Sequence, residues 1–161
     1  MSDVPVVLLE ERVLGDARLL ALATLNIERS LNSRSLDMIE LLLPALQRWA
    51  TDPRVVAVFL QGSGEKAFCA GGDVRRICLG VRENGIEDPY AQKFFTQEYK
   101  LDYLIHTFPK PVIVWGHGIV MGGGIGLMCG ASHRVVTESS RLAMPRSEEH
   151  TSELQSRSSI S

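Results

Sequence analysis

The sequence predicts an α/β domain in which ligand chemistry lies where strands lead into helices. Apolar, β-branched runs alternate with segments of helical periodicity, and glycines follow two of the apolar runs. The length of 161 residues allows one domain with a sizeable core but not two. Hydrophobic residues make up 45% of the chain and charged residues 22%, which is the balance of a soluble globular protein.

The N-terminal part predicts two strands and a helix. Residues 4–26 are rich in apolar and β-branched side chains, with a turn at Gly15 between two strands. Residues 29–53 then change to helical periodicity, and Ser33 or Ser35 can cap the helix that follows. A proline at the end of this segment stops the helix.

The remaining elements follow the same alternation. We expect a strand covered on both faces over residues 54–64, then a loop at 66–76 that enters a helix capped by Asp73, and a polar connection at 81–89. A second long helix follows over residues 90–107 and an apolar strand over 111–120. A short helix after the three glycines then leads to a last strand over residues 133–138.

Composition limits the classes of partner. A net charge of −2 argues against nucleic acid or an anionic membrane as the main partner. Three cysteines without C-x-x-C spacing indicate free thiols in a reducing compartment and no metal site; they are Cys69, Cys78 and Cys129. The first 13 residues lack a basic segment and an Arg/Ser bias, so we expect a cytoplasmic protein.

A membrane span is the alternative interpretation of the apolar residues 112–132. The stretch is about long enough to cross a bilayer, and its one ionisable side chain is His117. However, Gly116, Gly118 and the glycine triplet would make a poor continuous helix. A buried strand, a turn and a helix explain the same residues better, so no membrane partner is expected.

Glycines precede two predicted helices. A helix N-terminus presents backbone N–H groups without internal partners, and glycines 122–124 would let a substrate oxygen approach those groups. Gly71 and Gly72 repeat the arrangement before the helix capped by Asp73. Two such sites suggest an oxyanion hole with two donors on one carbonyl oxygen. Packing glycines remain an alternative, as does a phosphate cradle, although neither phosphate-binding glycine motif is present.

Four ordered motifs resemble the crotonase (enoyl-CoA hydratase/isomerase) superfamily, and most closely its 3-hydroxyisobutyryl-CoA hydrolase branch. They are KAFCAGGD, FFTQEYKLDYLI, KPVIVWGHGIVMGGGIGL and HRVVTESSRLAMP, and the resemblance covers residues 4–145. It implies a spiral of ββα units, an acyl-CoA substrate whose thioester carbonyl is held by two backbone N–H groups, and a homo-oligomer. It implies no metal or redox cofactor, since CoA enters as part of the substrate.

Mapped onto this chain, the resemblance implies that Gly72 and Gly123 supply the two N–H donors. It also places the segment of Ala70, Gly71, Gly72 and Asp73 beside CoA.

Glu98 carries its own signal. It falls on the apolar stripe of the second long helix, four residues after Phe94 and three before Leu101. A carboxylate on an apolar face is costly unless it is paired, and its pKa should rise. The alternative is an edge position where the carboxylate reaches solvent. The resemblance implies an active-site residue that binds substrate or transfers a proton.

Two departures from the family pattern bear on the chemistry. Hydratases of the superfamily carry a catalytic Glu three residues after the second oxyanion glycine, where this chain has Gly126, and this favours thioester hydrolysis. The hydrolases use a Glu after AMP, where this chain has Arg146, so we expect this chain to be inactive. An enoyl-CoA hydratase or isomerase is one alternative, and a non-catalytic acyl-CoA-binding protein is another.

We expect the domain to span residues 1–145 and to be truncated at its C-terminus. Residues 146–161 contain many serines and resemble a translated sequencing-library adapter, so we interpret them as a non-native or disordered tail. His117 is a candidate for shaping the site, whereas Trp49 and Trp115 are expected in the core.

Overall fold

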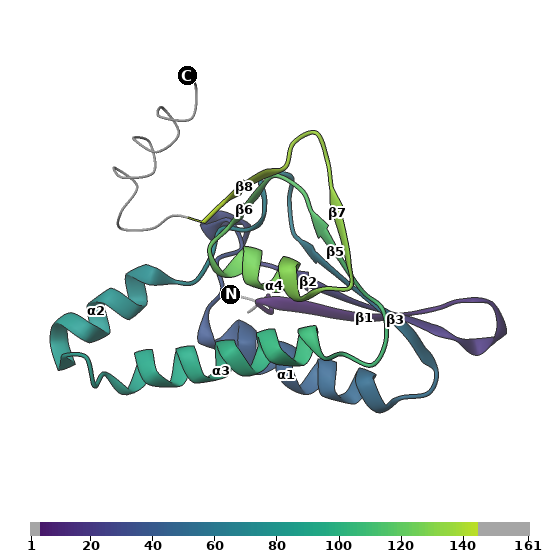
Figure 1. Ribbon diagram of the computed structural model, residues 1–161, viewed down its shortest axis with the longest axis horizontal. Coiled ribbons are helices and arrows are strands. Elements are labelled where there is room, and N and C mark those ends of the chain that lie inside the picture. The colour runs from purple at the N-terminus through teal and green to yellow at the C-terminus, as the bar shows by residue number, and fades with distance from the viewer. Residues whose placement is uncertain (1–3, 145–161) are drawn as a thin grey trace, which may run out of the picture.

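The computed structural model describes residues 4–144, which form the two sheets and four helices of Figure 1. The predicted tail, residues 146–161, and the position of Arg146 lie outside this described part.

The larger sheet has five strands in the order β1-β2-β3-β5-β7. The first two strands form an antiparallel hairpin, and the others pair in parallel. The strands are β1 (Val7–Val13), β2 (Leu19–Leu25), β3 (Val55–Gly62), β5 (Val112–Gly116) and β7 (His133–Val136). No residue of β3 is exposed, as expected for a strand between two neighbours with both faces covered.

A smaller, all-parallel sheet has the order β4-β6-β8. Its strands are β4 (Ala67–Cys69), β6 (Ile119–Met121) and β8 (Arg141–Ala143). The helices are α1 (Leu36–Thr51), α2 (Val74–Asn84), α3 (Pro89–His106) and α4 (Gly123–Gly130). The predicted α/β class is therefore confirmed.

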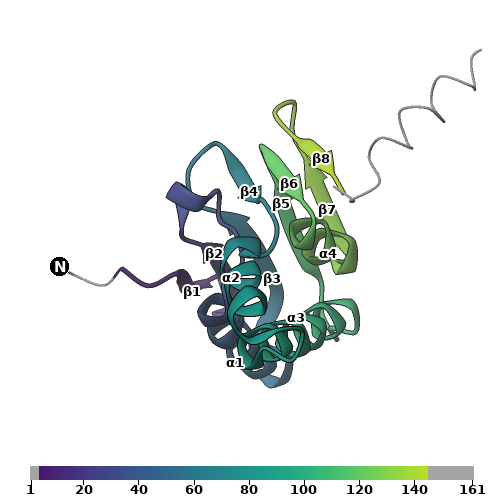
Figure 2. The same ribbon diagram turned by 90° about the vertical axis from the view of Figure 1, so that its left-hand side faces the viewer.

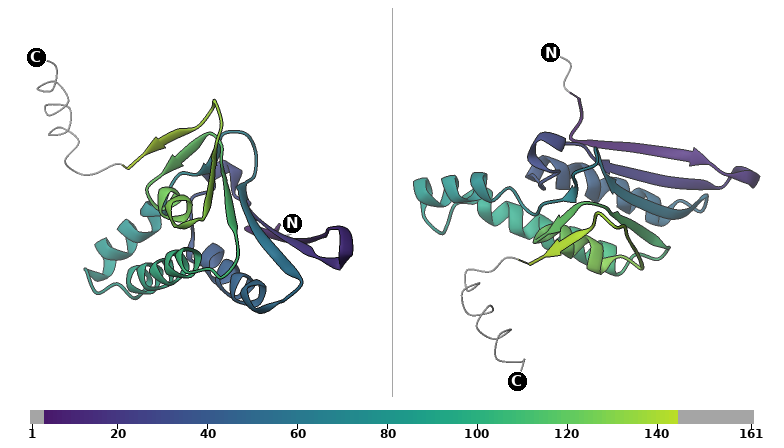
Figure 3. Two further views of the ribbon diagram at one scale, coloured as in Figure 1. Left: turned by 45° about the vertical axis from the view of Figure 1, so that its right-hand side comes forward. Right: turned by 90° about the horizontal axis from the view of Figure 1, so that it is seen from above.

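Three of the helices, α1, α3 and α4, lie together on one side of the larger sheet. Figures 1 and 2 show α1 beside α3, with α4 between α3 and the smaller sheet, and the contacts of these elements agree. By contrast, α2 projects from the body in both views of Figure 3 and contributes no buried residue. The site described below lies among α3, α4 and the smaller sheet.

Side-chain caps explain where three of the helices begin. Ser35 accepts a hydrogen bond from the Met38 amide at 3.2 Å, which selects Ser35 over Ser33 as the cap of α1. Asp73 caps α2 as predicted, and Asp88 caps α3. These contacts satisfy amide groups that the first turn of a helix leaves without partners.

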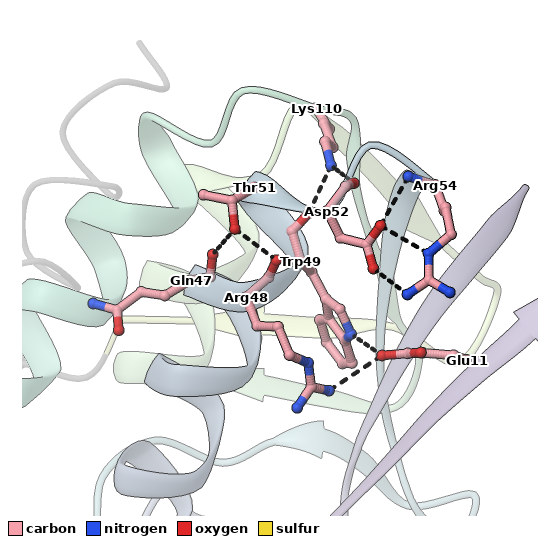
Figure 4. A network of polar contacts seen from close by, with 8 residues as sticks. All are labelled: Glu11, Gln47, Arg48, Trp49, Thr51, Asp52, Arg54 and Lys110. Carbon is pink, nitrogen blue, oxygen red and sulfur yellow. Dashed lines mark hydrogen bonds and ion pairs between the residues drawn. The ribbon is translucent and has the colours of Figure 1, made fainter.

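The end of α1 is tied to its surroundings by polar contacts (Figure 4). Trp49 is fully buried, as predicted, and its indole N–H donates to Glu11 of β1 at 2.7 Å. The Lys110 ammonium donates to the carbonyl oxygens of Trp49 and Asp52 at 2.7 and 2.5 Å. Arg54 in turn donates to the Asp52 carboxylate. These contacts join β1, the helix end and the chain entering β5.

The predicted strand over residues 111–120 is wrong in one respect. The segment is divided into β5 and β6, which belong to different sheets. The chain turns between them at Gly118, whose φ of +56° suits glycine. Trp115 is 38% exposed rather than in the core, because alternation along β5 turns Val112 and Val114 inward and Trp115 outward.

Three further differences concern short elements. β4 lies within the segment expected to be a loop, α2 continues to Asn84 and so enters the expected polar connection 81–89, and β8 was not expected. Strands of three residues carry too little periodicity to be recognised in a sequence. Among residues 4–144, no helix combines the length and the apolar character that a membrane crossing requires.

Candidate functional site

The two glycine segments meet at one edge of the smaller sheet. β4 and β6 pair in parallel, so their carboxyl ends lie together. A Cβ built on Gly122 would lie 3.7 Å from the Gly71 Cα, and one built on Gly71 would lie 3.8 Å from the Gly123 amide nitrogen. Gly71 and Gly122 have φ of +111° and +49°, which a residue with a side chain adopts only with strain.

Each segment presents an amide without a protein acceptor. Arg34 forms an isolated parallel bridge with Gly72: the Arg34 amide donates to the Gly71 oxygen at 2.7 Å, and the Asp73 amide donates to the Arg34 oxygen at 2.8 Å. This pattern turns the N–H of Gly72 away from Arg34. Gly123 begins α4, where amides have no intrahelical acceptor. Within the described part of the chain, neither amide donates a hydrogen bond to the protein.

Glu98 reaches this edge from α3. It is 9% exposed, so it is a buried residue on the apolar face rather than at a solvent-exposed edge. A Cβ built on Gly123 would lie 2.9 Å from the Glu98 Oε1 atom and would collide with the Arg34 guanidinium. The carboxylate therefore lies directly beside the first residue of α4.

Arg34 pairs with two carboxylates of α3. Its side chain is 0% exposed; Nη2 donates to Glu98 Oε1, and Nη1 donates to Asp102 Oδ1 at 2.9 Å. A buried guanidinium depends on such partners, because its charge has been removed from water. We call Arg34, Glu98 and Asp102 the buried ion cluster.

Burial raises the pKa of Glu98. The Arg34 guanidinium opposes this shift and the neighbouring Asp102 adds to it, but burial is the largest cause. A carboxyl group with a raised pKa gives up its proton closer to neutral pH, which suits a group that exchanges protons with a bound molecule. The rise expected from the position of Glu98 on the apolar stripe is confirmed.

Two residues of the buried ion cluster, Arg34 and Asp102, were not predicted from the sequence. Asp102 had a usable signal, because it follows Glu98 by four residues and so lies on the same face of one helix. Arg34 had none, since it lies in the loop before α1 and meets Glu98 only through the tertiary fold.

A hollow of about 430 Å³ adjoins the first glycine segment. Two arginines and several hydroxyl groups line this hollow. Its lining residues include Arg29, Ser30, Ser33, Gly72, Asp73 and Arg75. Ala70 holds the segment in place, because its amide donates to the Leu31 oxygen at 3.0 Å. His117 is not in this group: it lines a different hollow, and its Nε2 lies 2.9 Å from the Gly64 oxygen.

Residues 20–148 match the family model described as enoyl-CoA hydratase/isomerase. The relatives include the mitochondrial 3-hydroxyisobutyryl-CoA hydrolase of Danio rerio, which is 42% identical over 122 residues, or 76% of this chain and 31% of the relative. The Homo sapiens protein of the same name is 38% identical over 136 residues, or 84% of this chain and 34% of the relative. This chain thus spans about a third of the length of these relatives.

Solved structures agree with the sequence matches. An enoyl-CoA hydratase from Rhodobacter sphaeroides has a TM-score of 0.77 and 35% identity, covering 87% of this chain and 40% of that chain. A carnitinyl-CoA dehydratase from Mycobacterium thermoresistibile has a TM-score of 0.77 and 37% identity, covering 85% and 38%. These matches confirm the fold predicted from the four motifs.

Proposed function

Because this chain belongs to the enoyl-CoA hydratase/isomerase family, we propose that it binds an acyl-CoA thioester at its two glycine segments. The N–H groups of Gly72 and Gly123 would donate to the thioester carbonyl oxygen. The observation that carries this proposal is the contact between the segments of Gly71 and Gly122, beside which both amides lack a protein acceptor. Two fixed donors stabilise the negative charge that a carbonyl oxygen gains during acyl transfer.

The CoA portion has a suitable place beside the first segment. The hollow next to Gly72 and Asp73 carries Arg29 and Arg75, whose guanidinium groups suit the phosphates of CoA. We propose that the backbone of residues 70–73 runs along the adenine and pantetheine portions.

The reaction we propose is hydrolysis of the thioester. Water adds to the carbonyl carbon, the carbon–sulfur bond breaks, and the free acid and the CoA thiol are released. Two observations support hydrolysis: the relatives in Danio rerio and Homo sapiens are named hydrolases, and Gly126 offers no carboxylate for hydration. The acyl group we propose is 3-hydroxyisobutyryl, an intermediate of valine breakdown, with Glu98 in contact with the hydroxyacyl group.

Hydration of an enoyl-CoA is the second candidate. It is favoured by the similar solved structure from Rhodobacter sphaeroides, which is named a hydratase. Incubation of the Arg146→Glu variant with crotonyl-CoA separates the two reactions, because hydration consumes the double bond and hydrolysis releases a thiol. Since Arg146 stands where the hydrolases use a Glu, we expect this chain to bind acyl-CoA without turnover.

Calorimetric titration with two ligands tests the proposed carbonyl contact. One ligand is isobutyryl-CoA, and the other is the thioether in which CH₂ replaces its carbonyl group. Loss of two hydrogen bonds should weaken binding of the thioether by about tenfold or more. Equal affinities would show that the amides of Gly72 and Gly123 do not contact the carbonyl oxygen.

The assembly and the compartment remain proposals. We propose a homo-oligomer, as in the family, and sedimentation at increasing protein concentration measures it. A cytoplasmic location stays a prediction that fractionation of cells tests, whereas the names of the relatives place those proteins in mitochondria.

A further inference from the structure

Asp102 differs from the other members of the buried ion cluster in its access to solvent. Its side chain is 28% exposed, against 12% for Glu98 and 0% for Arg34. Asp102 also lies on the same face of α3 as Glu98, one turn further along. Asp102 is therefore the member of the cluster that solvent or a ligand can reach.

The carboxylate of Asp102 reaches toward α4. A Cβ built on Gly126 would lie 3.0 Å from the Asp102 Oδ2 atom, so this oxygen occupies the space that a side chain at position 126 would enter. Gly126 follows Gly123 by one turn of α4. Asp102 Oδ2 thus lies on the same side of α4 as the glycine that we assign to the thioester carbonyl.

One atom of Asp102 and one atom of Arg34 have no hydrogen-bond partner among residues 4–144. Oδ1 of Asp102 accepts from Arg34, whereas Oδ2 has no donor among residues 4–144. The Nε–H of the fully buried Arg34 likewise has no acceptor in that part of the chain. A buried polar atom without a partner is rare in proteins, and a bound ligand or water would satisfy it.

The charges of the cluster restrict the ligand group that fits. When both carboxylates are ionised, one guanidinium leaves a net charge of −1, and carboxylate oxygens only accept hydrogen bonds. An anionic acyl group would be repelled. A purely aliphatic group would remove water from Asp102 and return no donor. A hydroxyl group meets the requirement, because it donates one hydrogen bond and carries no charge.

We propose that Asp102, held by Arg34, is a second carboxylate of the acyl pocket and selects acyl groups that carry a hydroxyl. Arg34 is the positioning residue, because its planar fork donates to both carboxylates and so sets their separation. This inference rests on the proposed acyl-CoA function and adds a selecting residue to it.

Three CoA thioesters with one carbon skeleton provide the test. Isobutyryl-CoA, 3-hydroxyisobutyryl-CoA and methylmalonyl-CoA carry a methyl, a hydroxymethyl and a carboxylate at the same position. Calorimetric titration of the full chain should give the hydroxyl compound about tenfold or more tighter binding than isobutyryl-CoA. Methylmalonyl-CoA should bind most weakly.

The Asp102→Asn variant tests whether Asp102 causes the selectivity. This variant should lower the preference for the hydroxyl compound about tenfold and improve binding of methylmalonyl-CoA. Asp37→Asn, the same substitution at an exposed residue of α1, should leave both ratios unchanged. Arg34→Lys keeps the charge but loses the fork, and it should lower the same preference. If the cluster has only a structural role, these substitutions will change the melting temperature but not the affinity ratios.

The outcomes separate this inference from the proposed function. If no thioester binds, both fail. If all three thioesters bind equally, or if Asp102→Asn keeps the preference, the role of Asp102 fails and acyl-CoA binding stands. If Asp102→Asn does not fold, Asp102→Glu keeps the charge and moves the carboxylate by one methylene. Unchanged selectivity in Asp102→Glu would equally overturn the proposal.

Discussion

Arg34 and Glu98 are 64 positions apart in the sequence and form a hydrogen-bonded ion pair inside the protein. The pair joins the loop before α1 to α3, and both side chains lie against Gly123. Stability and the acyl-CoA binding that we propose should therefore depend on the same few atoms. A substitution at this pair should change both properties.

Arg34→Leu should lower the free energy of unfolding by about 3–5 kcal/mol, because it leaves two carboxylates without their buried partner. Urea unfolding of both proteins measures the difference. Arg29→Leu is the control, since Arg29 is exposed and should change stability by less than about 0.5 kcal/mol. Equal effects of the two substitutions would mean that the ion cluster contributes nothing to folding.

Glu98→Gln should change how stability depends on pH. The pKa of Glu98 is raised in the folded state, so its contribution to stability is fully present below its unfolded pKa of about 4.3 and is lost as pH rises through the folded pKa. The neutral Gln lacks this loss, so the stability of the variant relative to the parent should increase as pH rises over that window.

Urea unfolding at several pH values measures this trend. Glu83→Gln, at an exposed residue of α2, gives the background for the same substitution. A relative stability of Glu98→Gln that stays constant or falls with increasing pH would contradict the direction of the pKa shift.

Gly123→Ala should weaken acyl-CoA binding by about tenfold or more, because the new methyl group would displace Arg34 and Glu98 from the first turn of α4. Calorimetric titration with isobutyryl-CoA measures the loss. Gly15→Ala is the matched control, since a Cβ built there has no atom within 4 Å. Retained affinity in Gly123→Ala would remove this glycine from the proposed site.

Asn32→Ala should lower the free energy of unfolding by about 3 kcal/mol. Asn32 is fully buried; its amide group donates to the oxygens of Ser63 and Ala67 at 3.0 and 2.9 Å, and its oxygen accepts from the Ile27 amide at 2.9 Å. Alanine would leave these groups without partners.

Thermal and urea unfolding test the Asn32 prediction. Asn26→Ala is the comparison, because Asn26 makes an exposed hydrogen bond to the Pro5 oxygen and its loss should cost about 1 kcal/mol or less. If both variants lose the same stability, Asn32 does not hold the loop that carries Arg34.

Features set by neighbours in the chain were predictable. Asp73 caps α2 and Ser35 caps α1, because a side-chain oxygen at that position reaches an amide three residues later. Helical spacing placed Glu98 on the apolar stripe of α3 and left a solvent-exposed edge as the alternative, which the buried side chain excludes. The division of residues 111–120 into two strands did not follow, since both parts are apolar and only their partners show that they belong to different sheets.

The sequence by itself determined which segments become helices, that glycines precede α2 and α4, and that one carboxylate lies on the apolar stripe of α3. These properties depend on spacing and on local backbone freedom, so they are encoded within a few residues of each position. Only the tertiary structure decided that Gly71 meets Gly122 and that Arg34 and Asp102 join Glu98. Those contacts depend on the parallel pairing of β4 with β6 and on the packing of α3 against α4, and no local pattern in the chain specifies which distant segments pair.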